Sequence, residues 1–85
     1  MDSKPTIIVY GADWCEDTIA SRAVLDRLGY SYRYVDVDHD EPGEALIQSK
    51  NNGKRQTPTI DINGKFLIEP SDEELTRVLG EIGKS

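Results

Sequence analysis

The stretch Thr6-Ile-Ile-Val-Tyr-Gly-Ala-Asp-Trp-Cys15 joins a short β-branched run to the one cysteine of the chain. Residues 6–10 show no polar alternation, which is typical of a parallel strand that is buried on both faces of a sheet. Residues 11–13 break this run. We therefore predict an interior strand that ends in a short loop just before Cys15.

A helical pattern follows the cysteine. Ile19, Ala23 and the pair Val24 and Leu28 recur at intervals of three or four residues, which predicts a helix. Gly29 stands where a glycine commonly follows a helix end.

Residues 30–37 read as a second strand. Three tyrosines share one of its faces, and Val35 and Val37 share the other. Strand, helix and strand over about 30 residues make a βαβ unit with a right-handed crossover.

An acidic connection, residues 36–41, leads into a second helix. Asp40 can cap this helix and Pro42 falls in its first turn, although Gly43 weakens it. Residues 51–53, Asn-Asn-Gly, are expected to end it.

Asn63-Gly64 separates two apolar runs, residues 59–62 and 65–68, and this dipeptide is a strong hairpin signal. Ser71-Asp-Glu-Glu74 is a capping box, and apolar residues then recur at helical spacing up to Ile82. The predicted order is β-α-β-α-β-β-α, an α/β fold in one domain over residues 1–85.

Composition restricts the possible functions. The chain has 85 residues, 36% of them hydrophobic, and a net charge of −6, which argues against nucleic acid and anionic membranes as partners. No apolar run approaches the ~20 residues of a membrane span, and residues 1–5 lack a signal-peptide core, so we expect a cytoplasmic protein. One cysteine and one histidine are too few for a zinc site in a single chain.

Cys15 is the candidate reactive group. A thiol at a helix N-terminus lies near backbone N–H groups and the positive end of the helix dipole, which favour the reactive thiolate. A buried, inert cysteine is the alternative, but the polar Glu16-Asp-Thr18 that follows favours an accessible thiol. Since the chain has no second cysteine, redox chemistry needs a sulfur from another molecule.

Two further features lie near this chemistry. Trp14 either shields the thiol and offers an apolar surface to a partner, or covers the edge of a small core. Pro58 opens the third predicted strand. A cis bond before Pro58 would expose the backbone N–H and C=O of Thr57 to an extended peptide or a thiol ligand.

These features together resemble the thioredoxin fold in its small glutaredoxin form, most closely mycoredoxins and related glutaredoxin-like proteins. Three stretches carry the resemblance: residues 10–15, 51–59 and 63–72. It implies a four-stranded mixed sheet flanked by helices, and a cis bond before Pro58. It also implies thiol–disulfide exchange, in which a cysteine attacks a mixed disulfide between a protein and a small thiol such as glutathione or mycothiol.

The resemblance also assigns roles to individual positions. Cys15 matches the nucleophile, and Thr57 and Pro58 match the turn that pairs with the ligand. Ser71 and Asp72 match the helix start that holds the γ-glutamyl end of glutathione. Further candidate contacts are Trp14 beside the thiol and Arg55, which matches a basic residue near the ligand carboxylate.

The motif Cys15-Glu-Asp-Thr18 departs from the family pattern. Thr18 replaces the resolving cysteine, and it either donates a hydrogen bond to the thiolate or is an ordinary first-turn residue. Glu16 and Asp17 stabilise the helix through its dipole, but their charges also raise the pKa of a nearby thiolate. We therefore predict that the Cys15 pKa is less depressed than in a C-P-Y-C protein.

The sequence thus favours a monomeric, monothiol glutaredoxin-like oxidoreductase that reduces protein–small-thiol mixed disulfides through Cys15. A small thiol would be its co-substrate, with no tightly bound cofactor and no metal. A non-enzymatic binding module, whose acidic surface near Trp14 docks a basic protein, is the alternative. A cluster-binding dimer is disfavoured because the C-G-F-S motif of such proteins is absent.

Overall fold

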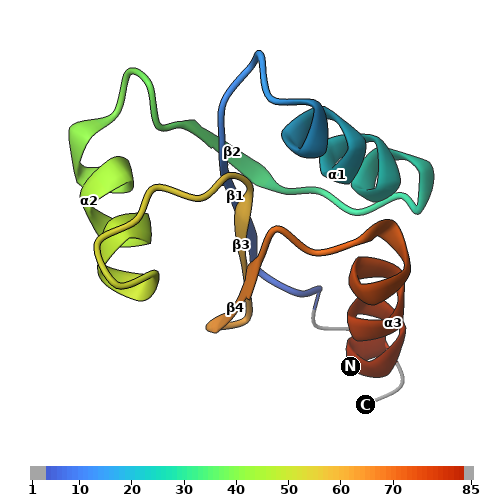
Figure 1. Ribbon diagram of the computed structural model, residues 1–85. Helices are drawn as coiled ribbons and strands as arrows, with labels where there is room; N and C mark the ends of the chain where they lie inside the picture. Colours follow the sequence, from blue (N-terminus) through green and yellow to red (C-terminus); the bar gives the residue numbers. More distant parts are fainter. Residues whose placement is uncertain (1–3, 84–85) are drawn as a thin grey trace.

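The computed structural model describes residues 4–83, which form one sheet and three helices (Figure 1). The order is β-α-β-α-β-β-α, as predicted. The elements are β1 (Ile7–Gly11), α1 (Glu16–Arg27), β2 (Arg33–Asp36), α2 (Glu41–Lys50), β3 (Thr59–Ile62), β4 (Lys65–Ile68) and α3 (Asp72–Gly83).

The sheet is four-stranded and mixed, with the strand order β2-β1-β3-β4. β1 pairs in parallel with β2 and antiparallel with β3, and β4 completes the hairpin with β3. β1 therefore lies in the interior of the sheet, as its apolar run predicts. This is the thioredoxin-like arrangement that the resemblance implies.

Helices cover both faces of this sheet (Figure 1). Alternate residues of β1 point to opposite faces: Ile7 and Val9 belong to the cluster under α1 and α3, whereas Ile8 and Tyr10 belong to the cluster under α2. β1 is thus buried on both faces. Ile47 of α2, which is fully buried, contributes to the second cluster.

The second strand is shorter than predicted, because β2 runs from Arg33 to Asp36 and not from residue 30 to residue 37. β2 lies at the edge of the sheet, where its four residues pair with residues 8–11 of β1. The assignment of its two faces is confirmed: the tyrosines at 30, 32 and 34 pack on the α1 and α3 side, and Val35 and Val37 pack on the α2 side.

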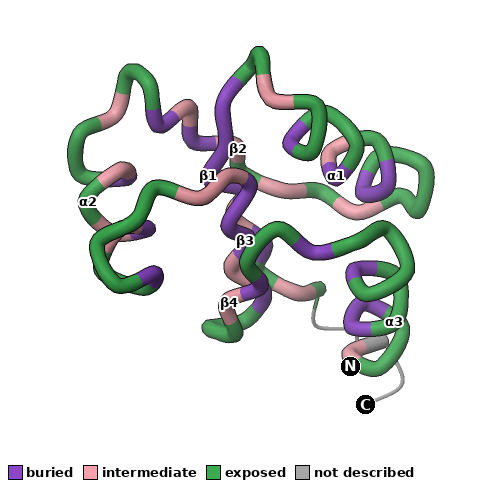
Figure 2. The backbone as a smooth tube through the Cα atoms, in the orientation of Figure 1, coloured by how far each residue is buried: buried purple, intermediate pink, exposed green. Residues whose placement is uncertain are grey.

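The predicted helix after Cys15 is confirmed as α1, but its apolar residues are only partly buried. Val24 is buried, but Ile19 is 53% exposed, Leu28 is 41% exposed and Ala23 is exposed. Figure 2 shows buried and exposed segments alternating along α1. The helix instead buries Thr18, Ser21, Val24 and Leu25. Small polar side chains in its first half let the helix approach β1 closely, since a Cβ atom added at Gly11 would lie 2.4 Å from the Thr18 methyl group.

The signals at the ends of the elements are confirmed. The Asp40 carboxylate caps α2 by accepting a hydrogen bond from Gly43 N at 2.7 Å. Asn63 and Gly64 both adopt positive φ angles, 53° and 90°, in the hairpin turn. Gly43, which the sequence marked as a weakness of α2, allows a close approach, because a Cβ there would lie 2.8 Å from a Val35 methyl group. Within residues 4–83, no helix has the length and apolar character needed to cross a membrane.

Candidate functional site

Cys15 is the residue that caps the N-terminus of α1, where the chain turns from the end of β1 into the helix. A turn bond from Cys15 N to Ala12 O, at 3.1 Å, shapes the loop, and Ile19 N donates to Cys15 O at 3.0 Å to begin the helix. The thiol makes no capping bond and is half-buried. The structure thus places the sulfur at the helix N-terminus, as the sequence predicts.

Thr57 contacts the sulfur of Cys15 directly. Its hydroxyl Oγ1 donates to Cys15 Sγ at 3.4 Å, and the thiol can donate to the Thr57 carbonyl at 3.6 Å. The antiparallel register sets Tyr10 opposite Thr59, so residues just after β1 meet residues just before β3. The bond between Thr57 and Pro58 is cis, as the resemblance implies.

The pKa of Cys15 is lowered from its ordinary value. Burial acts in the opposite direction, but hydrogen bonds that stabilise the thiolate outweigh it. They come from the Thr57 hydroxyl, from the backbone N–H and hydroxyl of Thr18, and from the backbone N–H of Asp17. Both Glu16 and Asp17 are exposed. That their charges leave the thiol less acidic than in a C-P-Y-C protein stays a prediction.

Thr18 is fully buried in the first turn of α1. Its Oγ1 accepts a hydrogen bond from Ala12 N at 3.4 Å, and its methyl group packs against Gly11. The same hydroxyl contributes to the lowered pKa of Cys15. Thr18 therefore belongs to both the packing of α1 and the environment of the thiol.

Trp14 and Arg55 meet at Asp38, a residue that sequence reasoning did not single out. The indole N–H of Trp14, whose residue is 69% exposed, donates to Asp38 Oδ2 at 2.8 Å. Arg55 forms an ion pair with the other Asp38 oxygen, and its Nε lies 3.5 Å from Glu44 Oε2. The only sequence signal for Asp38 was the acidic connection between β2 and α2.

A second group of side chains that the sequence did not reveal holds the loop before Cys15. The Tyr34 hydroxyl donates to Asp13 Oδ1 at 2.7 Å, and the Arg22 guanidinium carbon lies 3.9 Å from the centre of the Tyr34 ring. Burial, followed by the bond to Asp13, raises the pKa of Tyr34. Asp13 thus has a hydrogen-bond donor on β2 and a nearby cation on α1.

Ser71 and Asp72 start α3, where Ser71 Oγ accepts a hydrogen bond from Glu74 N at 3.0 Å. The residues before them return to the thiol side, because Glu69 N donates to Pro58 O at 2.8 Å. Both side chains are exposed. The chain that leads into α3 therefore passes beside Pro58. The side chains of Ser71 and Asp72 are not hydrogen-bonded to Cys15.

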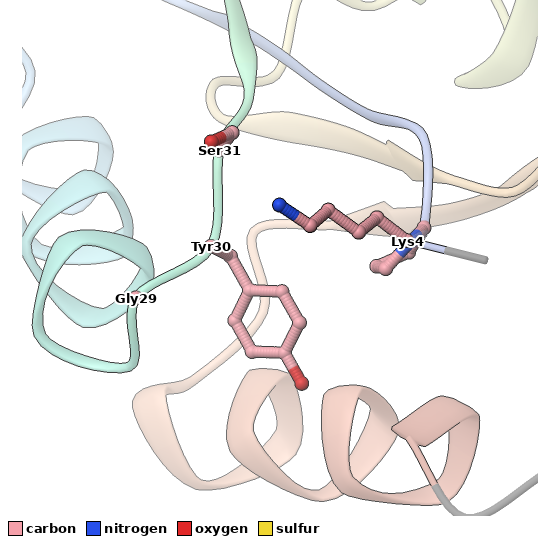
Figure 3. A pocket seen from close by; sticks show the side chains of 5 residues that line it. Lys4, Gly29, Tyr30 and Ser31 are labelled. Carbon is pink, nitrogen blue, oxygen red and sulfur yellow. The ribbon is translucent and has the colours of Figure 1, made fainter. Parts of the chain in front are cut away.

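A hollow of about 220 Å³ lies elsewhere, at the ends of β1 and β2 that are opposite to Cys15 (Figure 3). Lys4, Gly29, Tyr30 and Ser31 line it together with Pro5. It contains no thiol, and the Tyr30 hydroxyl donates to Leu79 O at 3.4 Å, which is a packing contact. Among residues 4–83, no three histidine, cysteine or acidic side chains gather where they could hold a metal ion.

Comparison with known proteins gives the same picture. The glutaredoxin family model matches residues 7–67. Mycoredoxin 1 of Corynebacterium glutamicum is 35% identical over 54 residues, which cover 64% of this chain and 66% of the relative's length.

Two solved structures share the fold. The glutaredoxin of Methanosarcina mazei Go1 has a TM-score of 0.72 at 26% identity, and the match covers 88% of this chain and 78% of that chain. A buckwheat glutaredoxin–glutathione complex has a TM-score of 0.67 at 22% identity, with 93% and 80% covered. Because the family model matches most of the length of this chain, the chain belongs to the glutaredoxin family.

Proposed function

We propose that this protein is a monothiol thiol–disulfide oxidoreductase that reduces mixed disulfides between proteins and a small thiol. The observation that carries this proposal is the position of the Cys15 sulfur. It lies at the start of α1 and within hydrogen-bond distance of the Thr57 hydroxyl. Both features stabilise the thiolate, which is the attacking species in thiol–disulfide exchange.

The reaction needs only one protein sulfur. The Cys15 thiolate attacks the small-thiol sulfur of the mixed disulfide, so that the substrate protein leaves as a thiolate and Cys15 carries the small thiol. A second molecule of small thiol then attacks this disulfide and releases Cys15 with formation of the oxidised small thiol. One free small-thiol molecule is thus consumed for each protein thiol released. Its sulfur and the sulfur from the mixed disulfide end together as the oxidised small thiol, and no resolving cysteine is required.

The neighbouring residues support binding of such a ligand. Backbone groups of Thr57 next to Pro58 are proposed to align the incoming sulfur, and Trp14 to cover one side of it. Ser71 and Asp72 at the start of α3 are candidate contacts to the far end of the small thiol. Arg55 is a candidate contact to its carboxylate, although Asp38 and Glu44 already neutralise this guanidinium.

The test is to incubate the reduced protein with a glutathionylated peptide, first without free glutathione, to trap the adduct, and then with excess glutathione, to follow turnover. Intact mass and the rate of peptide release are then followed. We expect one glutathionyl adduct on Cys15 and catalysed release, with both absent in Cys15→Ser. Release at equal rates by wild type and Cys15→Ser would remove the proposal. Absence of any adduct would favour a binding module without redox turnover.

A further inference from the structure

The side chain of Asp38 bonds separately to two segments that flank the thiol. Its Oδ2 accepts from the indole of Trp14 at 2.8 Å, and its Oδ1 pairs with the guanidinium of Arg55. Trp14 comes from the loop after β1, whereas Arg55 precedes β3. One carboxylate therefore joins the two segments that carry Cys15 and Thr57.

Together with the contact between Thr57 and Cys15, these bonds form a closed ring of residues. Trp14 is the chain neighbour of Cys15, and Thr57, two residues after Arg55, donates to the Cys15 sulfur at 3.4 Å. We call Cys15, Trp14, Asp38, Arg55 and Thr57 the contact ring. Asp38 is its only member that comes from neither of the two segments next to the thiol.

The backbone around Asp38 is itself fixed. Asp38 N donates to Asp36 Oδ1 at 3.0 Å, and Val37 N donates to the carbonyl of Gly11, the last residue of β1, at 2.9 Å. The Asp38 and Arg55 side chains are 28% and 31% exposed, and both residues lie at the surface. The Asp38 carboxylate thus extends from a loop whose backbone is held by two hydrogen bonds.

We propose that Asp38 is a positioning residue, which holds Trp14 and Arg55 in place on either side of the Cys15–Thr57 contact. This inference rests on the proposed function. Asp38 does not touch the sulfur, and the main causes that set the direction of the Cys15 pKa are burial and hydrogen bonds from Thr57, Thr18 and Asp17. Its removal should therefore impair the placement of a bound disulfide and leave the acidity of the thiol unchanged.

The experiment uses Asp38→Ala, which removes both bonds, and Asp38→Asn, which keeps an acceptor for Trp14 but loses the charge that pairs with Arg55. Asp26→Ala is the matched control, because it removes the same charge from an exposed position on α1. Trp14 is the one tryptophan of the chain, so its fluorescence reports this site alone.

Fluorescence anisotropy and acrylamide quenching come first, in a Cys15→Ser background that needs no turnover. We expect lower anisotropy and stronger quenching in Asp38→Ala, an intermediate result in Asp38→Asn, and no change in Asp26→Ala. Unchanged Trp14 fluorescence in Asp38→Ala would overturn the proposal.

Kinetics with the glutathionylated peptide complete the test. We expect kcat/KM to fall about tenfold in Asp38→Ala, which corresponds to about 1.4 kcal/mol, while the pH profile of Cys15 alkylation stays at the wild-type position. Wild-type kcat/KM in Asp38→Ala, or a shifted alkylation profile, would defeat the positioning role. If wild type itself shows no turnover, the proposed function fails and the Asp38 role falls with it.

Discussion

Thr57 contacts the Cys15 sulfur with groups suited to both of its protonation states. The Thr57 hydroxyl, 3.4 Å from Sγ, can donate to the thiolate, and the Thr57 carbonyl, 3.6 Å from Sγ, can accept from the thiol. The sulfur therefore keeps a partner in the same residue whether or not it holds its proton. Burial opposes a low Cys15 pKa, but hydrogen-bond donors from Thr57, Thr18 and Asp17 outweigh this effect, so the pKa is lowered.

Removing the Thr57 hydroxyl should make the thiol less acidic. Thr57→Val keeps the shape of the side chain but loses the donor, so the pKa of Cys15 rises. The rate of iodoacetamide alkylation measured against pH gives this pKa directly. Thr76→Val, an exposed threonine on α3, is the control and should not move the profile. An unchanged profile in Thr57→Val would show that this hydroxyl does not stabilise the thiolate.

Thr18 should matter for both stability and reactivity. Thr18→Val leaves the buried Ala12 N–H without its 3.4 Å acceptor, so the free energy of unfolding should fall by about 1–3 kcal/mol. The Cys15 pKa should rise as well, because a donor to the thiolate is lost. Urea denaturation and alkylation measure the two effects. Thr18→Ser, which keeps the hydroxyl, should preserve the pKa, and a shift as large as that in Thr18→Val would contradict this assignment.

The acidic residues after Cys15 should act through long-range charge. Replacing Glu16 by Gln and Asp17 by Asn is expected to lower the Cys15 pKa. It should also speed reaction with the anionic glutathione disulfide more than with the cationic cystamine. Both effects should fade near 1 M salt, where the Debye length is about 3 Å. Alkylation and stopped-flow rates at two salt concentrations test this, and salt-independent effects would point to a local structural change instead.

The same substitution should have opposite effects at two glycines. Gly64 adopts a φ of 90° in the hairpin turn, so Gly64→Ala should lower the free energy of unfolding by about 1–2 kcal/mol. Gly80 lies within α3, where an added Cβ atom would meet only open space, so Gly80→Ala should raise that free energy by about 0.4–1 kcal/mol. Paired urea melts measure both, and equal signs would contradict the turn geometry.

Acid should open the contact ring. The bond from Arg55, followed by that from Trp14, lowers the pKa of Asp38 from its ordinary 3.8. A carboxyl with a depressed folded pKa contributes stability above its unfolded pKa, and this contribution is lost as pH falls through the folded pKa. Trp14 fluorescence should therefore change below pH 3.8 in wild type. The same titration in Asp38→Asn should lack this transition, and its persistence would assign it to another group.

Much of the fold was predictable because its signals are local. The β-branched run before Cys15 predicted β1, Asn63-Gly64 predicted the hairpin, and Ser71 predicted the start of α3. The buried face of α1 was not predictable from periodicity. Close approach to Gly11 selected the small Thr18 over the larger Ile19 as the inward residue.

The residues of the site could likewise be predicted only where their sequence signals are local. Cys15 and Thr57 could be placed from their positions next to predicted strands. Asp38 could not, because its partners Trp14 and Arg55 lie 24 and 17 residues away in sequence. Only the order of the strands in the sheet brings these three loops together.

The pairing of β1 with β3 has a consequence for how the chain can be assayed. Tyr10 lies opposite Thr59, so the ladder between them fixes how far Thr57 stands from Cys15. If the register between β1 and β3 shifted by one residue, Thr57 would move by about 3.4 Å. The side chains of β3 would also turn to the opposite face of the sheet. The thiol can lose its hydroxyl donor in this way only if the core is also disrupted. Alkylation of Cys15 can therefore serve as a chemical readout of correct folding, without any knowledge of the substrate.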